Sequence, residues 1–409
     1  MLLALCKLAV RNVLRNRRRS GLTLASVIIG VAALFFIQSL IKSLQADMVD
    51  RAIGVFNAHL QVQSKASDDP KIPEASFGGV AEIDAALKAD PEITAVSKRI
   101  LFTGLVASAV NSMGVGVFSI DPQDESKLST ISSYVRDGRF LEAGREIIVG
   151  SKIAKNLDVR IGEKVVIMAQ SREGAFEGRA LRVVGIFETG SYTWDASMVY
   201  MMRQDAQDLL AWGDEVNTIA VKIKDASKLH AVQQRLAGAL GASQKGLKVL
   251  SWKDVSAEII HIQGFQDSVL LLVLTVVFAI VALGILNTML MSLFERIREF
   301  GLMMALGAKR RDVAVLLLTE SAYLGVVGMS WGAAWGMSII IFFHFVGLPL
   351  PLGEALSYFL PFEKTLFLRF AWSSHLLAIV CVVLVSCVAG IVPALRVRRL
   401  RAAEALRHV

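Results

Sequence analysis

The chain has 409 residues, of which 54% are hydrophobic and 20% charged, and its mean hydropathy is +0.54. A soluble protein with an ordinary polar surface is not this apolar, so the composition predicts an integral membrane protein. The formal net charge of +8 comes mainly from basic clusters that flank apolar runs, so it signals membrane topology rather than nucleic-acid binding.

Four apolar runs are long enough to cross a bilayer, for which about 20 apolar residues suffice. They occupy residues 20–43, 268–294, 313–343 and 370–395. We therefore expect an α-helical membrane protein with four transmembrane helices. Residues 44–267 form a large domain on one side, and residues 344–369 form a shorter loop on the same side.

Lys and Arg gather in three places beside these runs, and short basic segments are disfavoured for translocation. The clusters are Lys7, Arg11, Arg15, Arg17, Arg18 and Arg19; Arg296, Arg298, Lys309, Arg310 and Arg311; and Arg396, Arg398, Arg399, Arg401 and Arg407. We therefore expect residues 1–19, 295–312 and the tail 396–409 in the cytoplasm, and residues 44–267 and 344–369 outside it.

Residues 1–19 alternate leucines and valines with basic residues, as an amphipathic helix on the inner leaflet would. A cleaved signal peptide is the rival interpretation. The following apolar run is too long for a signal sequence and lacks a small-x-small cleavage site, which favours an uncleaved anchor. No helix breaker separates the first apolar run from residues 42–56. Residues 252–266 are also expected to be helical and to continue into the second apolar run. Two helices should therefore connect the exported domain to the membrane spans.

From Asn57 the pattern changes to strand-like alternation, which predicts an α+β exported domain. Strands are expected near residues 59–64, 95–110, 114–120, 146–149, 164–169, 179–187, 198–202, 217–223 and 247–250, and helices near 80–88, 204–211 and 227–240. An outer subdomain, about 57–120 plus 214–251, would hold an inserted β-rich subdomain of about 121–213. Because Cys6, Cys381 and Cys387 all lie outside this domain, no disulfide is expected in it.

The segment 295–312 between the second and third runs is a short amphipathic helix by its pattern. Its polar stripe carries Glu295, Arg296, Arg298 and Glu299. Its apolar positions are Ile297, Phe300, Leu302, Met303, Met304 and Leu306, and Gly307 ends it. Such a helix either lies in the headgroup region or offers its apolar face to a partner.

The third run carries Gly328, Gly332 and Gly336 on one helix face, which permits close helix packing. We expect this face to pack on the fourth span, with a subunit interface as the alternative. Glu320 lies about two turns from the cytoplasmic charges, where an anchor at the membrane boundary, with a coupling role behind it, is expected. Pro393 should kink or stop the fourth span.

Catalytic signatures are absent from the sequence. The stretch from Gly241 to Lys248 has Leu247 where a phosphate-binding loop requires Lys, and a predicted helix rather than a strand precedes it. The six histidines are scattered, with no spacing that suggests a zinc site or a catalytic triad. The chain is therefore expected to be a non-enzymatic subunit without a metal or cofactor of its own.

Residues Glu295–Asp312 closely resemble the coupling-helix loop of the permease family that includes FtsX, MacB, LolC and LolE. The shared features are the Glu-Arg-x-Arg-Glu start, Ala-Leu-Gly-Ala at 305–308, the basic residues 309–311, Glu320 and a Glu-Ala-Leu-Arg tail at 404–407. The resemblance implies an ABC-type complex in which this helix docks on a separate ATPase dimer that binds ATP and Mg²⁺. The contact residues it implies are Glu295, Arg296, Arg298, Glu299, Gly301, Met304, Leu306, Gly307 and Ala308.

Within that family, residues 182–195, 199–200 and 206–210, with Ala58–Val62, are similar to the lipoprotein-releasing branch, LolC and LolE. The resemblance implies a bacterial inner-membrane permease that extracts lipoproteins, works with a second permease copy or homologue and delivers to a periplasmic acceptor. A MacB-like efflux permease and an FtsX-like signal transmitter without cargo are the alternatives. An apolar groove for cargo, in contact with membrane lipids, would be lined by Phe35, Phe36, Leu40, Val269, Leu272 and Val276, although any lipid-facing stripe has the same composition.

Overall fold

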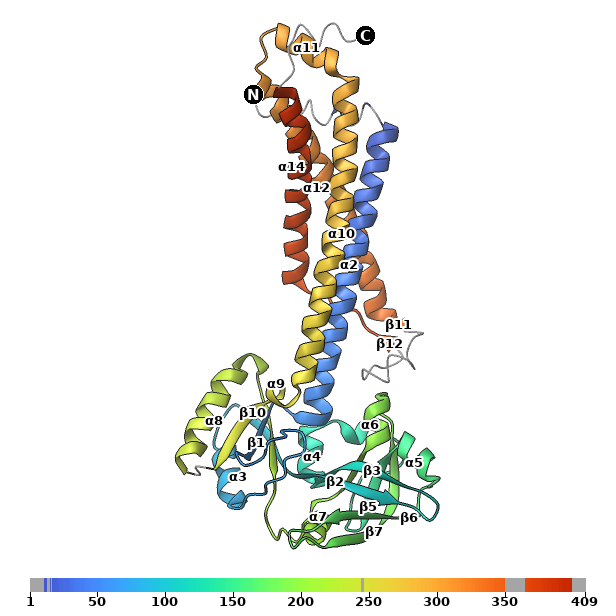
Figure 1. Ribbon diagram of the computed structural model, residues 1–409, viewed down its shortest axis with the longest axis vertical. Helices are drawn as coiled ribbons and strands as arrows, with labels where there is room; N and C mark the ends of the chain where they lie inside the picture. The colour runs from blue at the N-terminus through green and yellow to red at the C-terminus, as the bar shows by residue number, and fades with distance from the viewer. Residues whose placement is uncertain (1–10, 13–14, 16, 244–245, 350–364, 399–409) are drawn as a thin grey trace. The chain divides into compact units, whose positions relative to one another are not determined.

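The computed structural model of the chain describes residues 11–12, 15, 17–243, 246–349 and 365–398 (Figure 1). The chain divides into two compact units, which are described separately below. Unit 1 comprises Met1–Leu44, Gly264–Leu348 and Leu366–Val409, and unit 2 comprises Gln45–Gln263 and Pro349–Thr365. Most of the predicted helix at 1–19, most of the loop at 344–369 and the tail beyond residue 398 fall outside the described residues.

Unit 1 is a helix bundle. Its long helices are α2 (Arg17–Arg51), α10 (Ala257–Glu295), α12 (Arg310–Val346) and α14 (Trp372–Arg398). Among the described residues, these four helices are long and apolar enough to span a membrane, which confirms the number of spans predicted from hydropathy. Helix α11 (Ile297–Ala305) lies between α10 and α12, and β11 (Leu348–Pro349) pairs with β12 (Thr365–Leu366).

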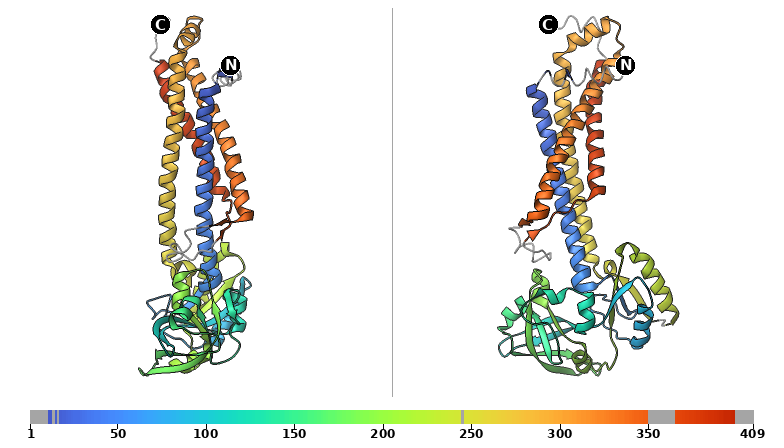
Figure 2. Two further views of the ribbon diagram at one scale, coloured as in Figure 1. Left: turned by 90° about the vertical axis from the view of Figure 1, so that its right-hand side faces the viewer. Right: turned by 180° about the vertical axis from the view of Figure 1, so that it is seen from behind.

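Gly328, Gly332 and Gly336 of α12 pack against α2 and not against α14, so the predicted partner helix was wrong while packing within the chain was correct (Figure 2). A β-carbon at Gly328 would meet Val27, one at Gly332 would meet Val31, and one at Gly336 would meet Phe35. The two helices run parallel, and bulky side chains of α2 fill the space that the glycines leave. Small residues commonly bring membrane helices together in this way.

Helix α14 has its own close contact with α12. Ser386 lies against Gly325, and Ser321 lies against Gly390, so each helix supplies one glycine and one serine to an antiparallel contact. Helix α14 continues past Pro393 to Arg398, so of the two predicted effects of this proline, a kink or a stop, the stop was wrong. Proline removes a single backbone hydrogen bond, and membrane helices tolerate that loss.

Helices α2 and α10 are antiparallel neighbours. The hydroxyls of Thr23 and Thr288 share a hydrogen bond, Gly30 lies against Val281, and Lys42 forms an ion pair with Asp267 at 2.9 Å. Both helices continue without interruption from unit 1 into unit 2, as the absence of helix breakers in the sequence predicted.

Unit 2 is built on a ten-stranded sheet in the order β10-β1-β9-β2-β3-β8-β5-β7-β4, with β6 pairing to β2 and β7. The strands are β1 (Leu60–Ser64), β2 (Ile93–Ala107), β3 (Ser112–Ile120), β4 (Val135–Gly138), β5 (Glu146–Gly150), β6 (Lys164–Gln170), β7 (Phe176–Phe187), β8 (Met198–Met202), β9 (Thr218–Ile223) and β10 (Leu247–Ser251). Strand β2 connects two regions of the sheet, because residues 93–99 pair with β9 and residues 100–107 pair with β3.

Helices cover this sheet and close its hydrophobic core. They are α3 (Val80–Lys88), α4 (Pro122–Leu128), α5 (Ser151–Leu157), α6 (Tyr192–Ser197), α7 (Arg203–Leu210), α8 (Leu229–Ser243) and α9 (Trp252–Val255), with 3-10 turns at Ile131–Tyr134 and Ala226–Lys228. Leu87, Val232 and Leu236 are buried with strand residues such as Val62 and Val221 in one large apolar cluster. The alternating strands and amphipathic helices predicted from the sequence are largely present.

Candidate functional site

A polar network fixes the hairpin that joins α10 to α12. Glu320 of α12 is only 2% exposed, and its carboxylate accepts hydrogen bonds from Asn12 at 2.6 Å and from Arg296 at 3.2 Å. Arg296 also donates to Glu299 at 2.9 Å. A buried carboxylate that is paired with an arginine and an amide is stabilised in place, and breaking such a pair is costly. Glu320 therefore anchors the hairpin to the helix that follows it.

Two ion pairs connect the same hairpin to the residues around the start of α2. Arg15 donates to Glu299 at 3.0 Å, and Arg19 donates to Glu295 at 2.6 Å. The hydrogen bond from Arg296, with a further contribution from Arg15, holds the pKa of the Glu299 carboxyl below its usual range. Glu295 and Glu299 are therefore bound to arginines of the chain itself, and they hold the first end of the hairpin to Arg15 and Arg19.

The apolar face of α11 is covered within the chain at its first turn, whereas a wholly free face was expected. Ile297, Phe300 and Gly301 are buried, and the Arg296 guanidinium lies over the Phe300 ring at 5.1 Å. Phe300 packs in a cluster whose other buried members are Leu293, Val313, Leu316, Leu317 and Val397. The end of α14 and the first turns of α12 thus provide the cover that a partner was expected to provide.

The exposed residues of α11 and of the turn that follows it form the tip of the hairpin, which we define as Arg298, Leu302, Ala305, Leu306 and Gly307. Leu306 is 82% exposed and Leu302 is 56% exposed. Gly307 has φ of +100°, a conformation that favours glycine and ends α11. Met304 and Ala308 are half-buried beside the tip. Leu302 and Ala305 were not among the predicted contact residues, although their spacing from Arg298 and Leu306 places them on the same helix face.

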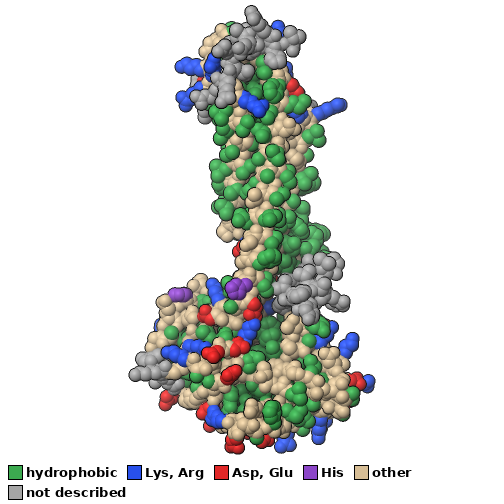
Figure 3. Space-filling model, viewed as in Figure 1, with side chains coloured by type: hydrophobic (Ala, Val, Ile, Leu, Met, Phe, Trp, Pro, Cys, Tyr) green, Lys and Arg blue, Asp and Glu red, His purple; other side chains and the backbone are tan. Residues whose placement is uncertain are grey.

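The six residues expected to line a groove do not share one surface. Phe35 is 1% exposed and packs on Gly336 and on the ring of His375, so it is a packing residue inside the bundle. Phe36 and Leu40 are half-buried, and Phe36 contacts the ring of Phe343. Only the α10 members are open, with Val269, Leu272 and Val276 exposed by 40%, 65% and 50%. Hydrophobic side chains cover the visible face of this bundle, and Lys and Arg gather at its hairpin end (Figure 3).

A π-helix, Ala52–Asn57, follows α2, and its carbonyls accept hydrogen bonds from other residues of unit 2. Thr130 donates to Gly54 O, Ser129 to Val55 O, and Arg99 to Phe56 O. Arg99 and Glu125 are each 1% exposed and form a buried ion pair. These contacts were not predicted from the sequence, because their residues come from the π-helix, from β2 and from α4 with the residues that follow it, and no local pattern connects them. Short π-helical turns often occur at functional positions.

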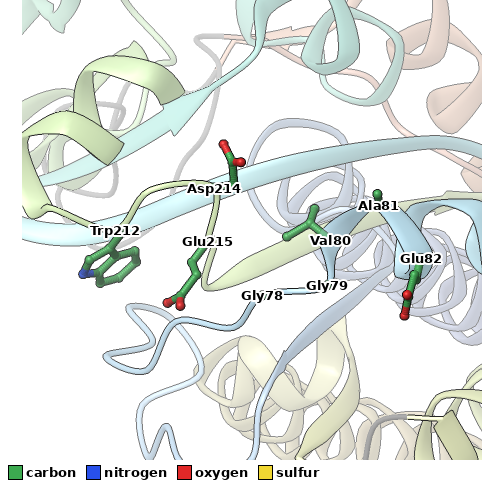
Figure 4. A pocket seen from close by; sticks show the side chains of 8 residues that line it. All are labelled: Gly78, Gly79, Val80, Ala81, Glu82, Trp212, Asp214 and Glu215. Carbon is green, nitrogen blue, oxygen red and sulfur yellow. The ribbon is translucent and has the colours of Figure 1, made fainter.

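A recess of about 420 Å³ lies in unit 2 between the start of α3 and the loop after α7. Figure 4 shows Trp212 and Glu215 on one side and Val80 and Glu82 on the other. Glu215 is already bound by Arg172 and Ser76, and the hydrogen bond from Arg172 lowers the pKa of its carboxyl. The recess therefore combines an aromatic ring with a carboxylate that the chain itself neutralises.

No group of three or more His, Cys, Asp or Glu side chains suited to a metal ion is found among the described residues. His375 hydrogen-bonds the carbonyl of Ala371 and stacks on Phe370, and His344 hydrogen-bonds the carbonyl of Leu368. Both histidines thus serve the packing of unit 1.

Two family models match the chain in succession. The MacB-like periplasmic core domain matches residues 20–239, and the FtsX-like permease C-terminal domain matches residues 271–402. Together they cover the first span with the exported domain, and then the remaining spans with the hairpin.

Among individual relatives, the chain is 22% identical to the lipoprotein-releasing system transmembrane protein LolC of Neisseria meningitidis serogroup B, with 97% of each chain covered. It is 21% identical to LolE of Haemophilus influenzae, covering 93% of this chain and 92% of that protein. It is 26% identical to the pyoverdine export ATP-binding/permease protein PvdT of Pseudomonas fluorescens, where 96% of this chain spans 57% of that protein.

Among solved structures, the periplasmic region of MacB from Actinobacillus actinomycetemcomitans matches 51% of this chain and 95% of that chain. The sequence identity is 14% and the TM-score is 0.38, so we base no argument on this likeness.

Proposed function

Because the chain belongs to the family of ABC transporter permeases that joins a MacB-like periplasmic core domain to an FtsX-like C-terminal domain, we propose that it couples ATP hydrolysis on a separate subunit to movement of its exported domain. The observation that carries this proposal is the way the hairpin is built. It is bound to the start of α2 through Arg15–Glu299 and Arg19–Glu295, and it follows directly from α10. A shift of the hairpin would therefore act on both helices that continue into unit 2.

The tip of the hairpin is the proposed contact for an ATPase dimer. Leu302 and Leu306 are the exposed apolar side chains there, and the covered side of α11 stiffens the connection to α12. ATP and Mg²⁺ would bind to the partner subunit, and this chain would be non-catalytic. At the other end, the carbonyls of residues 54–56 are held by Thr130, Ser129 and Arg99, so movement of α2 would be passed to the sheet.

The proposed location is the bacterial inner membrane, with both termini in the cytoplasm and the large domain in the periplasm. The basic clusters beside the apolar helices support this orientation. The proposed division of the large domain into an outer subdomain, 57–120 plus 214–251, and an inserted subdomain, 121–213, has support from strands β10, β1 and β9, which are neighbours in the sheet, whereas β3 of the proposed outer part pairs with β8 of the inserted part.

For the cargo we propose a lipoprotein, extracted from the inner membrane and passed to a periplasmic acceptor with a second permease copy or homologue. LolC, named as a lipoprotein-releasing protein, is matched over 97% of its length, whereas PvdT, an ATP-binding/permease protein by name, is matched over 57%. Each acyl methylene taken from lipid costs about 0.8 kcal/mol, so the cargo path must be apolar. A MacB-like efflux permease and an FtsX-like transmitter without cargo remain the competing functions.

The deciding experiment is depletion of the protein in its own cells, followed by fractionation of inner and outer membranes. Retention of lipoproteins in the inner membrane is the expected result. Unchanged lipoprotein distribution together with altered tolerance to small exported molecules would identify an efflux permease instead. Mass spectrometry of the purified complex should recover an ATPase subunit in each case, so failure to find one would reject the coupling proposal itself.

A further inference from the structure

A groove of about 380 Å³ runs between the first turns of α12 and the last turns of α14 in unit 1. It is lined by Arg311, Ala314, Val315, Leu318, Ile391, Ala394 and Leu395. Six of these seven lining residues are apolar, and the arginine lies at the end of α12 that joins the hairpin. The groove is thus an apolar channel with one positive charge at one end.

The sequence explains why the two helices leave this space. Ser321 packs on Gly390 and Ser386 packs on Gly325, which brings the two backbones close together. Beyond this contact, towards the hairpin, Ala314 and Ala394 are too small to fill the gap that opens between larger side chains. The larger residues, Leu318 and Leu395 among them, then form its sides.

The charge at the groove differs from three of the arginines near the hairpin. Arg15, Arg19 and Arg296 are each paired with Glu299, Glu295 or Glu320. Arg311 is exposed, and within the part of the chain that the structure describes no acidic side chain lies within ion-pair distance of it. The chain has supplied carboxylates to one side of the hairpin and none to this groove, so an anion from outside the chain would complement it.

We propose that this groove binds an anionic phospholipid of the leaflet beside the hairpin, with an acyl chain along Val315, Leu318 and Ile391 and the phosphate on Arg311. Basic pockets between membrane helices on the cytoplasmic side suit such headgroups. The apolar walls suit the acyl chain, whereas free inorganic phosphate would find only one donor side chain there. The proposal needs the four membrane spans but not the nature of the cargo.

The test compares lipids that remain on the purified full-length protein, using native mass spectrometry after exposure to phosphatidylglycerol or phosphatidylcholine. The wild type should retain phosphatidylglycerol preferentially. Arg311→Gln should reduce that retention about fivefold, the effect of one basic residue near an anionic surface, and Arg311→Lys should restore most of it. Ala314→Phe, which fills the groove while leaving Arg311 in place, should reduce retention as well.

Arg18→Gln is the matched control, because Arg18 is an exposed arginine of α2 outside the groove. It should retain phosphatidylglycerol as the wild type does, and thermal unfolding of each variant checks that the fold is intact. Equal loss in Arg18→Gln and Arg311→Gln would reduce the effect to general surface charge and overturn the proposal. Displacement of the lipid by inorganic phosphate alone would also overturn the proposal. An Arg311→Gln variant that keeps its lipid but loses the ATPase subunit would overturn it as well, because Arg311 would then be a contact for a protein.

Discussion

Helices α2 and α10 are both long, apolar and continuous, yet they are buried to different extents. In its most apolar 18-residue window, α2 has mean hydropathy 2.4 and 39% of its residues buried, whereas α10 has mean hydropathy 3.2 and only 17% buried. The more apolar helix is therefore the less covered one. In a membrane protein, hydropathy measures how much of a helix lipid can cover, and close contacts depend on small and polar residues.

The contacts of α2 follow that rule. Its side chains Val27, Val31 and Phe35 fill the notches left by glycines of α12, and Gln38 donates to the carbonyl of Ser374 at the start of α14. Helix α10 instead presents Leu271, Leu272 and Leu283 outward. The comparison implies that α2 is part of the packed bundle, while α10 keeps apolar surface available for lipid, cargo or a second permease.

The largest effect should come from filling a notch on the packed side. A β-carbon at Gly332 would lie 2.7 Å from Val31 Cβ and 2.9 Å from the carbonyl oxygen of Ile28, so Gly332→Leu must push α12 away from α2. We expect a loss of about 3 kcal/mol in stability, the upper end of the usual cost of overpacking, measured as a lower thermal unfolding temperature and poor recovery of monodisperse protein in detergent.

Gly264→Leu on α10 is the control, because nothing lies within 4 Å of a β-carbon at that position. It should unfold at nearly the wild-type temperature. Equal damage from both substitutions would mean that α2 and α10 do not differ in the way described.

A smaller effect is expected at the polar network beside the hairpin. Glu320→Ala removes the carboxylate that Asn12 and Arg296 share, and because Arg296 keeps its bond to Glu299, the loss of these hydrogen bonds should cost about 1 to 3 kcal/mol. Glu295→Ala breaks only the more exposed pair with Arg19 and should cost less than about 1 kcal/mol. Chemical or thermal unfolding of the two variants side by side measures the difference, and a ranking in the opposite order would remove Glu320 as the anchor.

Much of this organisation was predictable from the sequence, for identifiable reasons. The four helices follow from long apolar runs, strand β1 follows from alternation of apolar and polar residues, and strands such as β6 and β8 follow from short apolar runs. Short elements were missed. Strand β4 has four residues and α6 has six, too few for a periodic pattern to appear.

Partner choice was not predictable in the same way. The glycine spacing in α12 identifies a notched face but contains no information on whether Val27 or Ser386 will fill it. Phe35 and Val276 are both apolar residues of a span, so the sequence grouped them, although one is buried and the other half exposed. For the same reason, the position of the hairpin helix could be predicted from the sequence, but the packing of Phe300 against Val397 and its neighbours could not.

Substitution at the tip of the hairpin should leave stability almost unchanged while affecting coupling. Leu306 is 82% exposed, so Leu306→Asp should alter the free energy of unfolding by less than about 0.5 kcal/mol. A carboxylate in an apolar contact would weaken ATPase docking, so we expect loss of permease-stimulated ATP hydrolysis in the reconstituted complex. Ala308→Asp, beside the tip, should act in the same direction. Wild-type coupling in both variants would place the ATPase contact elsewhere.

The smallest effect on folding is expected on the open face of α10, where the comparison with α2 is most direct. Val276 is 50% exposed, so Val276→Asn leaves no cavity and should change the unfolding temperature by a few degrees at most. Phe35 is 1% exposed, so Phe35→Asn places an amide in the packed bundle and should lower the unfolding temperature strongly. If Val276 faces the cargo path, its substitution should also reduce retention of lipoprotein by the purified complex without loss of the ATPase subunit.

Leu271→Asn tests the alternative that lipid alone covers α10, because Leu271 is 66% exposed on a different face of the same helix. Equal retention in the two asparagine variants of α10 would assign both faces to lipid, and a loss confined to Val276→Asn would mark the side on which cargo or a second permease lies.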